Sequence, residues 1–369
     1  MHKLFRCIAV LLILFIASLC RAQSAKDYLE YHSTIIKAER QLLIDSTKSA
    51  ILIYKNLFSK FDFIFPRDCL VAAQIAYYYN DYNAALGFLE RGFDWGLMPF
   101  HIIRCPVFRK EDTPFFKNVL ESFKRKRNQY LARINPEVIE KVLDIRWTDQ
   151  LFKTINPTYS ITNNGKSIIL DSITAKIMRE VIELTKKYGF PGQKVIGIVH
   201  NGILQELGRD SAKDLPIRYK NFAEKEFYRI PKGVGELNDF TYLSNEVVLI
   251  ALYHHPCAFQ ELTNEVLLQA IRSGNLYPND YGLLYTAQYC KCFASFKRVD
   301  SALISTLCPP EEPYNGGYAI GVAYDLADSN RINSNREKIG MRSICHQRKM
   351  IQYANDRKII IGFGMMETK

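Results

Sequence analysis

The chain has 369 residues, of which 48% are hydrophobic and 24% are charged, and its formal net charge is +11. The hydrophobic content is ample for packed cores, and 9 cysteines are too few for a disulfide scaffold of this length. The length predicts two domains of roughly 100 to 200 residues each.

Residues 1–22 have the pattern of a cleavable secretory signal. Lys3 and Arg6 precede an apolar run over 7–19, and Ala22 supplies a small residue at the last position before a cut. The run is shorter than the roughly 20 apolar residues of a membrane helix, so we expect no stable membrane span after cleavage. The pattern therefore predicts an exported protein, periplasmic or extracellular, cleaved after Ala22.

Cleavage of the signal changes the net charge and the number of cysteines, and both bear on which partners and sites we expect. It lowers the net charge to about +8, which favours anionic partners, with nucleic acid the least expected for an exported protein. The remaining cysteines are expected mostly as buried thiols. Cys290 and Cys292 lack the second pair or nearby histidines of a zinc site, so no metal is expected. Lipidation at Cys20 is the alternative to simple cleavage, but Leu19 stands where a small residue is expected.

Residues 23–135 are predicted to be helical throughout, with an internal repeat. The stretches 49–58 and 80–92 resemble each other, and Ala50 and Ala85 within them are 35 positions apart, close to the 34-residue period of a tetratricopeptide repeat. Small residues at Ala85 and Gly92 would let paired helices approach closely, while Cys69 occupies that family's tryptophan position. One good hairpin and one degenerate hairpin are too few to bury a continuous core, so we expect them to pack on the rest of the chain.

The second predicted domain, 136–369, begins at Pro136, a residue typical of a helix start. Before it, the basic run 124–127 is expected to be the solvated face of a helix. Hydrophobic periodicity and breakers predict helices over 137–153, 171–188, 246–253, 258–273, 280–296 and 334–353, a strand or helix over 195–199, and a terminal strand over 358–362. The expected fold class is mainly α: tetratricopeptide-like helical hairpins followed by a second mostly helical domain with a few short strands.

Five short motifs occur in order in the second region. They are Asp149-Gln150, Lys187-Tyr188-Gly189-Phe190-Pro191-Gly192, His254-His255-Pro256, Gly274 followed by Tyr285, and Arg336 with Ile339-Gly340-Met341. This series resembles a bacterial family of unknown function found in exported proteins, often behind short tetratricopeptide arrays. The resemblance implies export and covers about residues 140–345.

One candidate site is catalytic. His254 or His255 with Asp149 and Gln150 could form a hydrolase-like site, since an imidazole near a carboxylate acts as an oriented general base and an amide can hold a water. The chain has no Gly-x-Ser-x-Gly elbow and no His-Glu-x-x-His metal pair. The alternative is structural: a histidine at a helix end and a buried polar pair bonded to the backbone.

The other candidate site is a binding groove. Tetratricopeptide hairpins form grooves suited to helices or extended peptides, and the rings of Tyr78, Tyr79 and Tyr82 would supply amphipathic contact area. We favour an exported helical protein that acts as an interaction or scaffold module over an enzyme. The expected partner is another protein or peptide of the cell envelope, and no cofactor is implied.

Overall fold

The computed structural model describes residues 26–108, 113–155, 168–200, 202–214, 218, 264–288 and 329–362. These residues form helices joined by loops, which confirms a mainly α fold. The few short strands do not occur within these ranges. Residues 193–196 form helix α10 (Gln193–Ile196) rather than a strand, and 359–362 form neither a helix nor a strand.

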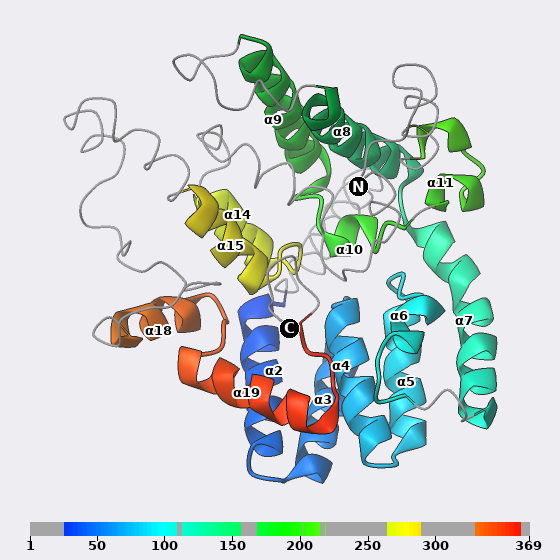
Figure 1. Cartoon of the computed structure of the whole chain (residues 1–369), viewed down its shortest axis with the longest axis vertical. Helices are drawn as coiled ribbons and strands as arrows, with labels where there is room; N and C mark the ends of the chain where they lie inside the picture. The colour runs from blue at the N-terminus through cyan, green and yellow to red at the C-terminus, as the bar shows by residue number, and fades with distance from the viewer. Residues whose placement is uncertain are drawn as a thin grey trace, which may run out of the picture.

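Four helices near the N-terminus form two hairpins, α2 with α3 and α4 with α5 (Figure 1). Their ends follow from local sequence: Asp27 and Asp81 accept hydrogen bonds from the main chain of the first helical turns of α2 and α5. Asn80 adopts a left-handed φ of 63° in the connection between α4 and α5. The helices are α2 (Tyr28–Leu42), α3 (Thr47–Lys60), α4 (Pro66–Tyr78) and α5 (Tyr82–Phe93).

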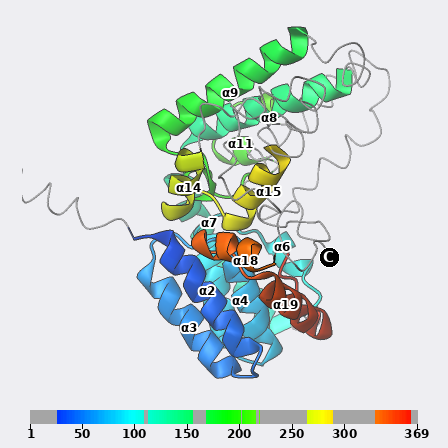
Figure 2. The ribbon, with the colours of Figure 1, turned by 90° about the vertical axis from the view of Figure 1, so that its left-hand side faces the viewer.

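Helix α4 lies at the centre of this part of the molecule, because its residues 66–77 are all buried. It packs against α5 on one side, and the C-terminal helix α19 (Ile344–Arg357) crosses the α2 and α4 side (Figures 1 and 2). Met350, Tyr353 and Ala354 of α19 belong to the same hydrophobic core as the two hairpins. The hydrophobic core of the two hairpins is therefore completed by a helix more than 250 residues later in the sequence.

The long helix α7 (Thr113–Arg133) connects the first core with a second one. Val119 of α7 lies in the first core, whereas Tyr130 lies in the second together with the antiparallel helices α8 and α9. The other helices are α6 (Pro99–Ile103), α8 (Pro136–Ile155), α9 (Ile168–Tyr188), α11 (Ile203–Glu206), α14 (Asn264–Arg272), α15 (Pro278–Gln288) and α18 (Ser329–Lys338), with a 3-10 turn at Ser211–Lys213.

The predicted helices over 137–153 and 171–188 are confirmed as α8 and α9. The predicted helix over 334–353 is wrong, because Gly340 adopts a φ of +79° and divides it into α18 and α19. The predicted helix 246–253 lies outside the described residues. The division into 23–135 and 136–369 stays a prediction, and across it α19 packs on the first core.

The basic run on α7 is only in part a solvated face. Lys124 and Arg125 are exposed, but Arg127 is buried, and its Nε lies 2.7 Å from Oε2 of Glu206. His200 Nε2 lies 2.7 Å from the other oxygen of Glu206. This cluster joins α7 to α11.

None of the helices within the described ranges is both long and apolar enough to cross a bilayer.

Candidate functional site

Two of the motif segments meet beside α2. A Cβ added at Gly192 would lie 1.5 Å from the main-chain oxygen of Asn275, and one added at Gly274 would lie 2.7 Å from the ring of Tyr28. Lys194 Nζ also donates a hydrogen bond to the oxygen of Ser273 at 2.9 Å. The glycines of these motifs therefore permit close backbone packing between the loops after α9 and α14.

A buried polar cluster lies next to this junction. Tyr31 and Tyr277 donate hydrogen bonds to the two carboxyl oxygens of Asp68, at 2.9 and 3.3 Å, and the Arg67 guanidinium lies 3.9 Å from the centre of the Tyr277 ring. Burial raises the pKa of Asp68 to about 6, although Arg67 and Tyr31 act in the opposite direction. Burial also lowers the pKa of His32 to about 3. Because every member is buried, the cluster joins α2, α4 and the start of α15 and offers no accessible surface to a substrate.

A second buried ionic cluster attaches the C-terminal part to α2. Arg342 Nε donates to Glu39 Oε2 at 2.6 Å, and His346 Nε2 lies 3.1 Å from the same oxygen. Burial raises the pKa of Glu39, but the charge and hydrogen bonds of Arg342 and the hydrogen bond with His346 outweigh it and bring the pKa to about 2. Glu39 is therefore ionised in the folded protein at neutral pH and holds the loop before α19 in place.

The predicted hydrolase-like site falls only partly within the described residues. Asp149 is buried in α8, with 1% of its surface exposed, and Gln150 follows it in the same helix. His254 and His255 lie outside the described residues. A catalytic pairing with Asp149 therefore stays a prediction.

The three predicted binding tyrosines lie at the tip of the α4–α5 hairpin and contact different elements. The Tyr79 hydroxyl accepts a hydrogen bond from Nε of Arg357 in α19 at 3.2 Å. The Tyr82 ring lies 5.1 Å from that of Tyr77 and is 42% exposed. Tyr78 is 43% exposed. The Tyr79 hydroxyl is thus already bonded within the protein, which leaves Tyr78 and Tyr82 as the more exposed rings.

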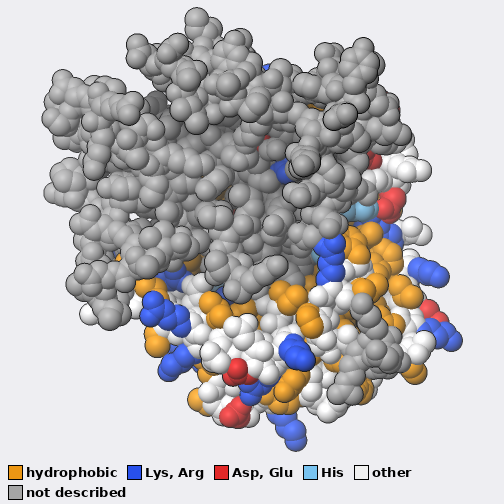
Figure 3. Space-filling model, in the orientation of Figure 1, with side chains coloured by type: hydrophobic (Ala, Val, Ile, Leu, Met, Phe, Trp, Pro, Cys, Tyr) orange, Lys and Arg blue, Asp and Glu red, His pale blue; other side chains and the backbone are white. Residues whose placement is uncertain are grey.

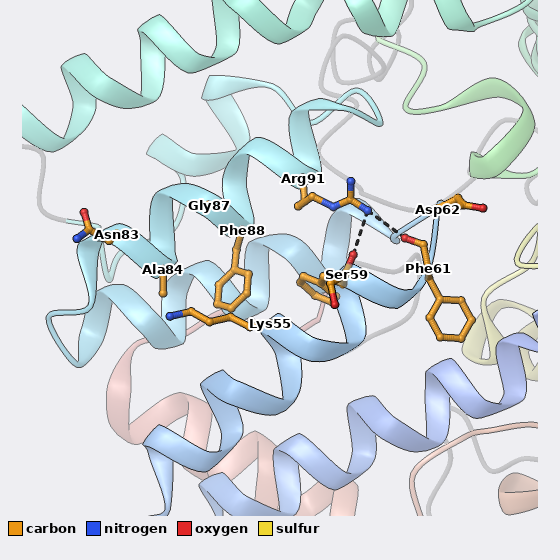
Figure 4. Close-up of a pocket in the computed structure, with 10 residues that line it drawn as sticks. Lys55, Ser59, Phe61, Asp62, Asn83, Ala84, Gly87, Phe88 and Arg91 are labelled. Atoms are coloured by element: carbon orange, nitrogen blue, oxygen red, sulfur yellow. Dashed lines mark hydrogen bonds between the residues drawn. The ribbon is translucent and has the colours of Figure 1, made fainter.

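An open groove lies between α3 and α5, and none of those three tyrosines lines it (Figure 4). Its volume is about 550 Å³. The rings of Phe58 and Phe88 pack edge to face at 5.4 Å and form an apolar floor. Gly87 keeps the space above this floor free, since a Cβ there would meet nothing within 4 Å. The groove is lined by Lys55, Phe58, Ser59, Phe61, Asp62, Asn83, Ala84, Gly87, Phe88 and Arg91.

Two cations border the apolar floor. Lys55 is about half exposed, and its Nζ lies 3.5 Å from the Asp81 carboxylate. Arg91 Nη2 donates to the main-chain oxygens of Phe58 and Phe61 at 3.1 and 3.0 Å, which satisfies carbonyls at the end of α3. Its Nε is buried without a hydrogen-bond partner among the described residues. Arg91 Nη1 also lies 3.8 Å from the Asp94 carboxylate, and Asp62 lines the same groove. The groove therefore combines apolar contact area with a charged border of two cations and one carboxylate. On the face drawn in Figure 3, Lys and Arg, Asp and Glu, and hydrophobic side chains are interspersed over the part formed by α2–α5 and α19.

Sequence reasoning missed this groove. Its walls come from two helices whose lining residues are about 30 positions apart, so only their packing brings Lys55 near Phe88. One sequence signal was available. Gly87 lies within a predicted helix, where glycine lowers helix stability by about 1 kcal/mol relative to alanine. A glycine kept at such a position often has a packing or functional role.

Thiols and acidic groups suggest no further site. Cys69 and Cys105 are buried free thiols, and Cys345 is an exposed one. Burial raises the pKa of Cys105 to about 12 and that of Cys69 well above its ordinary value, so both are inert at neutral pH. Within the described ranges, no three His, Cys, Asp or Glu side chains are grouped as metal ligands.

The chain matches no family model, and neither a curated protein nor a solved structure matches it. The resemblance of its motifs to an exported family therefore stays a prediction. The protein is mainly α, with two helix hairpins. The C-terminal helix α19 packs on one side of the hairpins, and the groove between α3 and α5 is open on another.

Proposed function

We propose that this protein is an exported helical interaction module and that the groove between α3 and α5 receives a segment of a partner protein of the cell envelope. The observation that carries this proposal is the apolar floor of Phe58 and Phe88, left open by Gly87 and bordered by Lys55 and Arg91. A partner segment that fits would place an apolar side chain on the floor and an acidic one beside a cation.

The lining residues favour binding over catalysis. They include no histidine, and the only hydroxyl, that of Ser59, donates to the main-chain oxygen of Asn56 at 2.8 Å. A serine nucleophile requires a base within hydrogen-bond reach. Asp62 is the single carboxylate, so the groove also lacks the paired acid and base of a hydrolytic site.

Typical free energies of apolar burial and of ion pairing indicate which groove contacts contribute most to binding. Burying a large apolar side chain stabilises a complex by about 1.5 to 3 kcal/mol. An exposed ion pair contributes about 0 to 1 kcal/mol and acts mainly on the association rate. We therefore expect affinity to depend first on the floor and second on Lys55.

The test is capture of partners from a cell-envelope extract by the full mature chain, followed by affinity measurement with the purified partner. Gly87→Leu fills the groove without straining the helix, and Lys55→Glu reverses a border charge. Lys48→Glu is the matched control, because Lys48 is exposed on the same helix but does not line the groove. We expect Gly87→Leu to lose the partner, Lys55→Glu to weaken it and Lys48→Glu to retain it. A partner held equally by wild type and Gly87→Leu would refute the assignment of this groove.

A further inference from the structure

The chain's own C-terminal segment lies against α4 as an extended peptide. Helix α19 ends at Lys358, which adopts a left-handed φ of 54°, and residues 359–361 then turn back beside α4 (Figure 1). Ile359 is 5% exposed and belongs to the first core, whereas Ile360 and Ile361 are partly buried against it. A run of β-branched residues favours this extended conformation.

Gln74 of α4 binds both main-chain groups of one residue in this segment. Its Nε2 donates to the oxygen of Ile360 at 2.8 Å, and its Oε1 accepts from the nitrogen of Ile360 at 2.9 Å. A neighbouring β-strand would satisfy the same two groups in the same way. Arg67, also in α4, donates to the oxygen of Ile361 at 3.4 Å. These contacts recognise the main chain and do not depend on the side chains it carries.

Gln74 is fully buried within a helix that is buried along almost its whole length. A buried amide is costly unless it is hydrogen-bonded. Gln74 Nε2 also donates to the oxygen of Leu70 in the same helix at 3.3 Å, whereas Oε1 accepts from the tail, so loss of the tail main chain leaves this oxygen without that donor.

We propose that the α4 face around Gln74 is a binding site for extended apolar peptides, and that residues 359–361 occupy it as an intramolecular ligand. The ligand class is a peptide with β-branched side chains that presents a free N–H and C=O opposite Gln74. This site lies on α4 and is separate from the groove between α3 and α5, so either proposal can fail without the other.

The tail competes with any external peptide. The tail follows α19 directly, so its effective concentration as a tethered ligand is at least about millimolar. The wild-type chain should therefore bind an external peptide weakly. A chain whose tail is weakened should bind it at least tenfold more tightly.

The probe is a fluorescently labelled peptide with the sequence of residues 356–362, titrated into the full mature chain and followed by anisotropy. Ile360→Pro removes the N–H that donates to Gln74 and leaves the rest of the tail present. Ile361→Pro, the matched control, keeps both main-chain groups of Ile360. We expect at least tenfold tighter binding to Ile360→Pro, binding close to wild type for Ile361→Pro, and loss of the gain when Gln74→Ala is combined with Ile360→Pro.

Two outcomes would overturn the proposal: a folded Ile360→Pro chain that binds no more tightly than wild type, or a gain that survives Gln74→Ala. A second measurement needs no variant. Millimolar peptide should accelerate hydrogen exchange of the Ile360 amide in the wild-type chain by displacing the tail. An unchanged exchange rate at that concentration would show that the tail is purely structural.

Discussion

Replacing Gly87 with alanine should stabilise the protein by about 0.5 to 1 kcal/mol. Gly87 lies in the middle of α5, and a Cβ there would meet no heavy atom within 4 Å. Alanine therefore fits the folded state without strain. It also reduces the conformational freedom of the unfolded chain, which is the source of the gain.

The same substitution at Gly92, five residues later in the same helix, should have the opposite effect. Its Cβ would lie 2.7 Å from Cδ2 of Leu97 and 3.2 Å from Cβ of Cys69. Leu97 and Cys69 are both fully buried, so neither has free space to move into. Overpacking costs about 1 to 3 kcal/mol and exceeds the gain in helix propensity, so we expect a net loss of about 1 to 2 kcal/mol.

Urea unfolding of the two variants and the wild type, followed by far-ultraviolet circular dichroism, measures both effects. At equal slopes, a shift in the midpoint reports a change in stability. We expect Gly87→Ala to raise the midpoint and Gly92→Ala to lower it. Shifts in the same direction would refute the reasoning, because it attributes the opposite signs to the space around the added methyl group.

Three further predictions concern the buried contacts between distant segments. Glu39→Gln should cost about 2 to 4 kcal/mol in urea unfolding, since it leaves Arg342, whose side chain is only 12% exposed, without its counter-charge; a loss below 1 kcal/mol would contradict this. Because folding lowers the pKa of Glu39 from 4.5 to about 2, its contribution is complete above about pH 4.5 and is lost as the pH falls toward 2. As the pH falls from about 4.5 toward 2, the urea midpoint should therefore fall more steeply for the wild type than for Glu39→Gln. Parallel plots of midpoint against pH would show that Glu39 does not cause the acid destabilisation. Gly192→Ala should yield little folded protein in expression and circular dichroism, because its Cβ would collide with the main chain of Asn275; a normal yield and spectrum would contradict the close approach.

The helices were the most predictable part of the fold. The periodicity and breakers over 137–153 and 171–188 correspond to α8 and α9, because capping and apolar spacing act within a few residues of each other. The terminal run 358–362 resembled a strand for a sound local reason, its β-branched residues. It is not one, because its main chain pairs with the side chain of Gln74 instead of a second strand.

The candidate site was far less predictable. The tyrosines at the tip of the α4–α5 hairpin were chosen for their chemistry, yet the hydroxyl of Tyr79 is bonded to α19. Most residues that line the groove between α3 and α5 belong to the two similar stretches around Ala50 and Ala85, but none of them was singled out as a contact residue. Its open space depends on the absence of a side chain at Gly87, which sequence reasoning did not interpret.

The sequence by itself determined that the chain is mainly helical, where helices such as α8 and α9 begin and end, and that small residues such as Gly92 lie where helices pack closely. Those properties depend on neighbours within one or two helical turns. Tertiary structure alone decided that Glu39 meets Arg342, 303 positions away, and that Gln74 holds Ile360, 286 positions away. The physical reason is that such partners are chosen by how whole helices pack, so the closed α4 face and the open groove exist only in the folded chain.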